Sequence, residues 1–147
     1  MITTIIVVAF VLLIYWALIK DGKYKQGVGE LKNGDPIKAS YSFNDVIIKN
    51  PNHYKAEFHM GICKEQMAGL YTPTDKRNLE LKNDAIKHFL RASEIKLDFL
   101  QPNNRIEILI CSEKDDNLKQ GMIAYAKKQI DTSSSNLKEQ YSWLFNF

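Results

Sequence analysis

The segment from Pro51 to Gly61 constrains the fold more than any other part of the sequence. Asn50 precedes the proline, and the residue before a proline is disfavoured in the helical conformation, so a helix should end here. Asn52 is suited to cap a second helix, whose residues are apolar on most of its circumference. Gly61 then provides a position without a side chain, where two helix axes can approach within about 8–10 Å. The segment therefore predicts two closely packed helices.

A helix is predicted directly before this break, over residues 37–48. Asp35 can cap it, and Pro36 fits its first turn. Its apolar residues recur at helical spacing, which gives the helix one apolar face. They are Ala39, Phe43, Val46 and Ile47. Part of this pattern, a trio at i, i+4 and i+7 along one helix face, returns later in the chain. It is formed there by Ala85, Phe89 and Ala92.

This combination of small and aromatic residues resembles the tetratricopeptide repeat, a two-helix unit of about 34 residues. In that family, small residues occupy the positions where paired helices cross, and a large aromatic side chain fills the space beside them. The resemblance covers about residues 36–95 and implies six helix-packing residues. They are Ala39, Phe43, Gly61, Ala85, Phe89 and Ala92.

The chain also departs from the family pattern. Val46 stands where an alanine is expected, and Glu57 and Lys64 stand where the first helix of a unit usually has aromatic residues. Residues 69–82 form a longer connection than the family turn. The helix after it is expected to run from residue 83 to about residue 100.

A fainter third unit is expected nearer the C-terminus. Residues 105–113 and 119–130 would form its two helices, with Gly121 and Tyr125 at the equivalent positions. Residues 137–145 are then expected to form a terminal helix that covers the stack. The predicted fold class is therefore all-α: an N-terminal transmembrane helix, then a short α-solenoid of two to three antiparallel helix pairs with a C-terminal capping helix.

The N-terminal prediction comes from residues 2–19, which carry no charged side chain. At about 1.5 Å per residue, a helix of this length covers roughly 27 Å, close to the hydrocarbon thickness of a bilayer. A cleaved signal peptide would need a basic start and a small-residue cleavage site, and both are missing. A buried core helix of this length is seldom apolar on every face. The sequence thus favours a single-pass membrane anchor over residues 1–20 that contacts lipid through residues 2–19.

Charge and composition set the expectations for the rest of the chain. Lysines follow the apolar run at positions 20, 23 and 25, so the positive-inside rule places the following domain on the cytoplasmic or equivalent side. Residues 21–35 are rich in glycine and predict a flexible or turn-rich connector to a helical domain of residues 36–147. The alternative is a partial helix that completes a first repeat. A net charge of +3, with no basic face carrying interleaved aromatics, argues against nucleic-acid binding.

No set of side chains has the spacing that a reaction or a metal ion requires. His59 and Cys63 are four residues apart, but His53, His88 and Cys111 lack motif-like spacing for further ligands. Cys63 lies in an apolar stripe, where a thiol stays protonated and unreactive. The two cysteines are expected to be free thiols, and a disulfide is the less favoured alternative. The sequence therefore predicts no enzyme, no cofactor and no metal.

Repeats of this family bind a peptide on the face lined by their first helices. Carried over by position, the resemblance implies five partner-binding residues: Phe58, Ile62, Glu65, Leu109 and Glu113. The family's acidic-tail clamp has Lys and Asn where this chain has Phe58 and Ile62. The expected ligand is therefore an apolar helix or strand rather than a free carboxylate.

The C-terminal segment is the last candidate surface. It contains Tyr141, Trp143, Leu144, Phe145 and Phe147. These residues either cap the core or form an exposed docking patch. Together the observations predict a membrane-anchored protein–protein interaction module that holds a partner protein at a membrane. The alternative is a structural accessory subunit of a large membrane-associated assembly, such as a respiratory-type complex or a virion.

Overall fold

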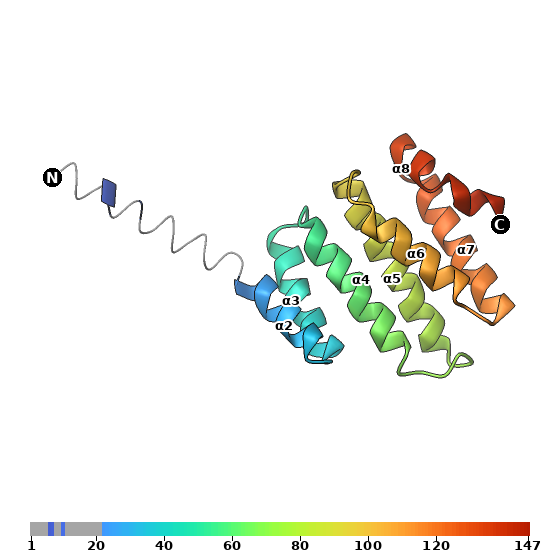
Figure 1. Cartoon of the computed structure of the whole chain (residues 1–147), viewed down its shortest axis with the longest axis horizontal. Helices are drawn as coiled ribbons and strands as arrows, with labels where there is room; N and C mark the ends of the chain where they lie inside the picture. Colours follow the sequence, from blue (N-terminus) through green and yellow to red (C-terminus); the bar gives the residue numbers. More distant parts are fainter. Residues whose placement is uncertain (1–5, 8–9, 11–21) are drawn as a thin grey trace.

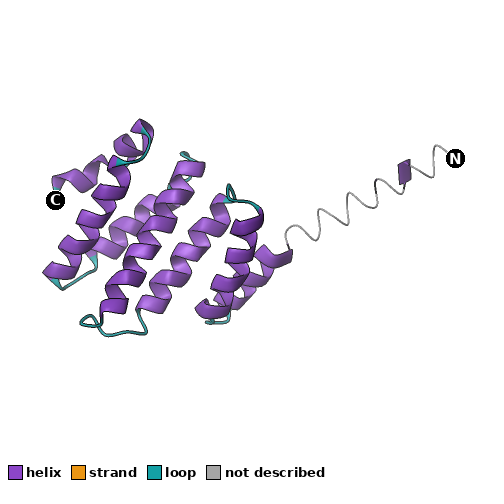
Figure 2. Ribbon diagram, turned by 180° about the vertical axis from the view of Figure 1, so that it is seen from behind, coloured by secondary structure: helices purple, strands orange, loops and turns teal. Residues whose placement is uncertain are grey.

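The computed structural model describes residues 6–7, 10 and 22–147. Figure 1 shows residues 22–147 as a row of helices joined by short connections. Figure 2 shows the same part of the chain from behind, and it contains no strand. The all-α part of the predicted fold class is confirmed for these residues. The elements are α2 (Gly22–Lys32), α3 (Pro36–Lys49), α4 (Tyr54–Ala68), α5 (Lys76–Ile95), α6 (Gln101–Cys111), α7 (Asp116–Asp131), α8 (Ser135–Gln140) and the 3-10 helix η1 (Ser142–Asn146).

Polar side chains begin four of these helices. Asp35, Asp75 and Asp115 cap α3, α5 and α7, and each accepts a hydrogen bond from a backbone N–H group of the first turn. Helix α4 begins differently from the prediction, because His53 caps it instead of Asn52. The His53 Nδ1 atom accepts a hydrogen bond from the N–H group of Ala56 at 3.0 Å.

Two segments predicted as connections are helical. The connector prediction for residues 21–35 is wrong from residue 22 to residue 32, which form α2. Tyr24, Val28 and Leu31 give this segment an apolar side at i, i+4 and i+7 that packs on the core, and this outweighs the low helix propensity of its glycines. Helix α5 begins at Lys76, because Asp75 caps it, and ends at Ile95. The connection between α4 and α5 is therefore shorter than predicted.

The predicted membrane anchor is corrected by the structure. Across the described residues, no helix combines the length and the apolar character needed to cross a bilayer. The longest, α5, has 20 residues, but lysine, arginine, aspartate and glutamate side chains recur along it. The transmembrane part of the fold class and the single-pass membrane localisation are therefore wrong as far as the structure describes the chain, because the described residues contain no membrane-spanning helix. Residues 2–19, on which that prediction depended, lie outside the described residues except for Ile6, Val7 and Phe10.

The helices pack mainly with their neighbours in the chain. Helices α2–α3 and α4–α5 form two pairs, and α3 packs against α4 between them. Helices α6 and α7 each pack against α5 more than against each other. The interior divides into an N-terminal core, formed by α3 and α4 and covered by α2, and a C-terminal core that runs from α4 to η1.

All six residues assigned to helix packing lie in the interior. The closest approach is at Gly61, where a Cβ atom would lie 2.5 Å from the Phe89 ring. The same arrangement occurs at Gly27, where a Cβ atom would lie 2.9 Å from the Phe43 ring. Real Cβ atoms do not come this close to ring carbons, so both helix crossings require glycine.

Candidate functional site

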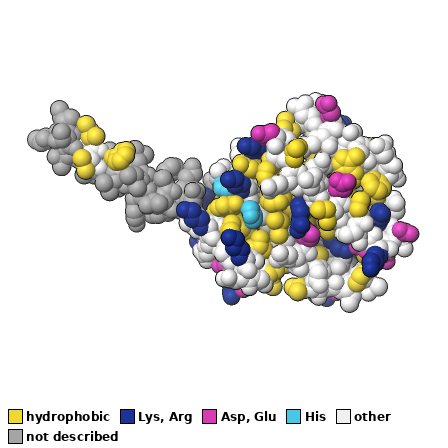
Figure 3. All heavy atoms as spheres, in the orientation of Figure 1, with side chains coloured by type: hydrophobic (Ala, Val, Ile, Leu, Met, Phe, Trp, Pro, Cys, Tyr) yellow, Lys and Arg dark blue, Asp and Glu magenta, His cyan; other side chains and the backbone are white. Residues whose placement is uncertain are grey.

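Helices α2, α4 and α6, the first members of the three successive helix pairs, contribute to one face of the domain. Figure 3 shows a stripe of hydrophobic side chains over α4 and its border with α2, with Lys, Arg and His side chains beside it. Val28 and Leu31 of α2 and Ile62 of α4 are half-buried, and Ile108 of α6 is 53% exposed. We call the surface made by these four residues the first-helix face.

An ion pair holds α6 against α4 at this face. The Arg105 Nη2 atom donates a hydrogen bond to the Glu65 Oε2 atom at 2.9 Å. Ile108 follows Arg105 by three residues, so both side chains lie on the same side of α6. Burial raises the pKa of Glu65, and the neighbouring Arg105 guanidinium opposes that increase. The position of Ile108 relative to Ile62 is thus fixed by a partly buried contact between the two helices.

Aromatic rings hold α2 against the beginning of α4. The Tyr24 ring lies 5.0 Å from the His53 ring and 5.6 Å from the His59 ring, centroid to centroid. The His59 Nδ1 atom lies 2.7 Å from the carbonyl oxygen of Lys55. Because a carbonyl oxygen only accepts hydrogen bonds, Nδ1 of His59 carries a proton. Burial lowers the pKa of His59, so this ring packs between the helices in its neutral form.

The structure separates the five predicted partner-binding residues. Ile62 is part of the first-helix face, and Glu65 bonds to Arg105 of α6. Phe58 and Leu109 are only 8% and 6% exposed and belong to the C-terminal core. The prediction is therefore wrong for Phe58 and Leu109, because a partner cannot reach a side chain that fills the core. The Phe58 ring, for example, lies 5.2 Å from the Phe99 ring.

Glu113 lies beyond the end of α6 and bonds to Lys82 of α5. Burial acts to raise the pKa of Glu113, but the hydrogen bonds from Lys82 and from backbone N–H groups outweigh it, so the pKa is lowered. Glu113 is therefore a charged group that ties the α6–α7 turn to α5. Its carboxylate is already bonded to Lys82 of the same domain.

The cysteine and histidine residues do not form a metal site. Among the described residues, no three or more His, Cys, Asp or Glu side chains are grouped so that they could hold a metal ion. Cys63 and Cys111 are both free, one buried and the other exposed. Burial raises the pKa of Cys63 to about 12, so its thiol stays protonated at neutral pH. Cys63 thus packs as a small apolar residue, four positions from His59 on the same helix.

A cavity of about 330 Å³ lies among α4, α5, α7 and α8. Glu57, His88 and Arg91 contribute its polar lining, and Leu137 part of its apolar lining. The His88 Nδ1 atom donates a hydrogen bond to the Glu57 Oε2 atom at 2.7 Å, and Arg91 donates one to Glu94 at 2.6 Å. Glu57, His88, Arg91 and Glu94 are therefore bonded within the domain, whereas Lys87, which also lines the cavity, forms no ion pair with any described residue.

The C-terminal aromatic residues combine the two predicted roles. Tyr141 and Leu144 are fully buried, and the Tyr141 hydroxyl shares a hydrogen bond with the Ser93 hydroxyl at 2.7 Å. Burial raises the pKa of Tyr141 to about 12. Phe145 and Phe147 are 45% and 50% exposed, with the amines of lysines from α7 over their rings. The segment therefore caps the core with its first part and exposes two rings at its end.

Val28, Leu31 and Ile108 were missed at the sequence level. The first two were assigned to the connector, although Tyr24, Val28 and Leu31 have the i, i+4, i+7 spacing of a helix face.

No family model matches this chain, and neither the curated proteins nor the solved structures give a match. The resemblance to the tetratricopeptide repeat therefore depends on the residue pattern alone.

Proposed function

We propose that this protein is a protein–protein interaction module that binds a segment of a partner protein on the first-helix face. The observation that carries the proposal is that partly exposed apolar side chains occur on all three helices, Val28 and Leu31 on α2, Ile62 on α4 and Ile108 on α6. Helix α4 contacts α2 through the rings of His59 and Tyr24, and it contacts α6 through Glu65 and Arg105. Apolar side chains spread in this way over three helices offer a surface that a partner can desolvate.

The remainder of the domain supports a binding role. Glu57 and His88 bond to each other, Cys63 is buried, and Glu113 bonds to Lys82, so these chemically active side chains are committed to contacts within the domain. We further propose that the α2–α3 and α4–α5 pairs are tetratricopeptide-like units, because each combines a glycine on its first helix with a phenylalanine on its second. In such a scaffold the first helices provide the binding surface.

Site-specific crosslinking in cells tests this function. A photoreactive phenylalanine analogue is placed at Ile62 or Ile108 of the full-length chain, and at Ile48 as the matched control. Ile48 is an exposed apolar residue of α3, with 69% of its surface accessible. We expect discrete crosslinked products to one partner from positions 62 and 108, and none to that partner from position 48. Absence of a shared product from 62 and 108 contradicts the proposal.

A second candidate function is that of a structural subunit in a larger assembly. It is favoured by a separate apolar surface on α3, where Ile37, Tyr41 and Ile48 are 46%, 70% and 69% exposed. These residues are spaced at i, i+4 and i+11, so they lie on the same side of the helix. The crosslinking experiment separates the two functions. Strong products from position 48 in every preparation, with none from positions 62 and 108, favour the structural subunit.

A further inference from the structure

We infer that the partner segment is an acidic amphipathic helix that lies over α2 and α4, with its apolar side on Val28, Leu31 and Ile62 and its carboxylates toward lysines of these two helices. This inference rests on the proposed function and specifies the chemistry of the partner. It follows from the distribution of charge around the apolar stripe.

The acidic residues of α2 and α4 are engaged within the domain. Glu30 accepts hydrogen bonds from Ser42 at 2.7 Å and from Gln26, and these bonds lower its pKa. Glu57 is bonded to His88, and Glu65 to Arg105. These three are the only acidic residues in the sequences of the two helices. Glu57 and Glu65 are therefore bonded to basic side chains, and Glu30, which stays ionised, is held by Ser42 of α3.

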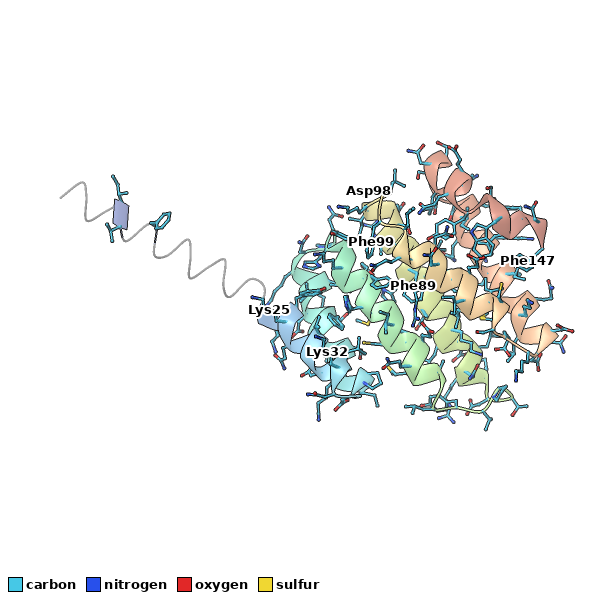
Figure 4. All side chains as sticks on the ribbon, in the orientation of Figure 1. Lys25, Lys32, Phe89, Asp98, Phe99 and Phe147 are labelled. Atoms are coloured by element: carbon cyan, nitrogen blue, oxygen red, sulfur yellow. The ribbon has the colours of Figure 1, made fainter. Side chains whose placement is uncertain are left out.

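Three lysines next to the stripe, by contrast, have no carboxylate partner among the described residues. Lys25 and Lys32 of α2 and Lys55 of α4 are exposed, and within the described part of the chain none of them forms an ion pair. Figure 4 labels Lys25 and Lys32 at two points along α2, and Figure 3 shows basic side chains beside the hydrophobic stripe in this region. Lys55 is one turn before His59, whose ring contacts Tyr24 of α2, so it lies at the same border. An apolar surface with unpaired lysines along its edge is complementary to apolar residues flanked by carboxylates.

The same geometry favours a helix as the ligand. A strand binds by adding to an exposed sheet edge, and residues 22–147 contain no strand to receive it. Lys25 and Lys32 are seven residues apart, which is roughly 10 Å along α2. A partner helix that runs along α2 can match this distance with two carboxylates spaced at i and i+7. Its apolar residues, at i+3, i+6 and i+10, would lie beside these carboxylates around the helix and meet the stripe.

Three synthetic peptides test the inference on the full-length protein. They share one amphipathic leucine pattern and differ only at the flanking positions, which are Glu, Gln or Lys. Binding is measured by fluorescence anisotropy at about 50 mM and about 300 mM NaCl, because attraction between exposed charges weakens as salt increases. We expect the Glu peptide to bind about tenfold more tightly than the Gln peptide at low salt, a difference that corresponds to two to three exposed charge pairs.

Two double variants test whether the preference for the Glu peptide comes from the lysines of α2. The double variant Lys25→Gln, Lys32→Gln should reduce binding of the Glu peptide to the level of the Gln peptide. The control variant Lys114→Gln, Lys138→Gln, which changes two other exposed lysines, should leave binding unchanged. Equal affinity for the Glu and Gln peptides, or equal loss in both double variants, overturns the inference. With either of these results, loss of peptide binding in the variant Ile62→Asp still supports the first-helix face as the binding site. If no peptide binds, the inference and the proposed function both fail.

Discussion

The two N-terminal helix pairs and the C-terminal pair are joined in different ways. In α2–α3 and in α4–α5, a glycine of the first helix lies against a phenylalanine ring of the second, Gly27 on Phe43 and Gly61 on Phe89. In α6–α7, the glycine is Gly121 on the second helix, and a Cβ atom there would lie 3.6 Å from Leu79 of α5, an ordinary contact distance. The first two pairs are thus closed by a ring that occupies the place of a side chain, and the third is not.

This difference explains how α6 and α7 are held. Both pack on α5 more than on each other. Lys82 of α5 bonds to Glu113 in the turn between them, and Ser93 of α5 bonds to Tyr141 after α8. The residue pattern identified the crossing at Gly61 and Phe89, but it missed the one at Gly27 and assigned Gly121 an equivalent position where the contact is ordinary. The close contact between a glycine and a phenylalanine ring is therefore found in α2–α3 and α4–α5, and the C-terminal helices use α5 as their support.

The largest effect is expected from removing the rings. Phe89→Ala should reduce the free energy of unfolding by about 3–5 kcal/mol, because it leaves a cavity at a fully closed crossing, and Phe43→Ala should cost a similar amount. Both are measured by urea unfolding followed by circular dichroism. Phe147→Ala, at a half-exposed ring, is the control and should cost less than about 1 kcal/mol. A small cost at Phe43 with a large one at Phe89 would show that the two pairs are not equivalent.

Adding a methyl group at the two crossings should have the next largest effect. Gly61→Ala and Gly27→Ala should each destabilise by about 1–3 kcal/mol through overpacking, although alanine is the better helix former. The cost should be greater at Gly61, where the ring is closer. In the double variant Gly61→Ala, Phe89→Leu, the smaller side chain relieves the overlap, so the two costs should not add. Additive costs would mean that the glycine and the ring do not act on each other.

The third helix pair should respond with the opposite sign. Gly121→Ala places its methyl group in ordinary contact with Leu79, so the higher helix propensity of alanine should stabilise the protein by about 0.5–1 kcal/mol. The shift in the midpoint of thermal unfolding is a sufficient measurement. If Gly121→Ala destabilises as much as Gly61→Ala, then α6–α7 is also a close crossing and the distinction between the regions is lost.

The smallest effect is a pH dependence confined to the N-terminal core. The pKa of His59 is lowered in the folded state, so below about pH 6.5 the unfolded chain binds more protons at this residue. This contribution to stability is present above that pH and is lost as the pH falls toward the folded-state pKa. In hydrogen exchange, amides of α2 should lose protection at acidic pH while those of α7 do not. His59→Phe should reduce that loss, and identical pH profiles for variant and native protein would contradict this role.

Sequence reasoning succeeded where a local rule decides the structure. Asp35 and Pro36 start α3, Pro51 follows its end, and the small and aromatic residues spaced at i, i+4 and i+7 are interior. It failed where tertiary contacts outweigh local propensity. The glycines of residues 22–32 predict a flexible connector, yet the packing of Tyr24, Val28 and Leu31 makes this segment a helix.

The candidate site shows the same division. Ile62 was identified from its position in the repeat pattern, but the same rule assigned Phe58 and Leu109 to the surface, and both fill the core. Their burial results from the approach of Phe99 and the C-terminal helices, which are distant in sequence or poorly matched to the pattern. The lysines at the edge of the stripe could not be assigned, because their significance depends on which carboxylates are already bonded.

The contact between Tyr141 and Ser93 has a consequence for the order in which the chain folds during synthesis. The N-terminal core is built from residues that leave the ribosome early and lie close together in sequence, so it can form while translation continues. The C-terminal core keeps an open place beside α5 until Tyr141 and Leu144 have left the ribosome. A nascent chain stalled before residue 141 should therefore have a folded N-terminal core and an incompletely packed C-terminal core. This is the form that a chaperone would encounter.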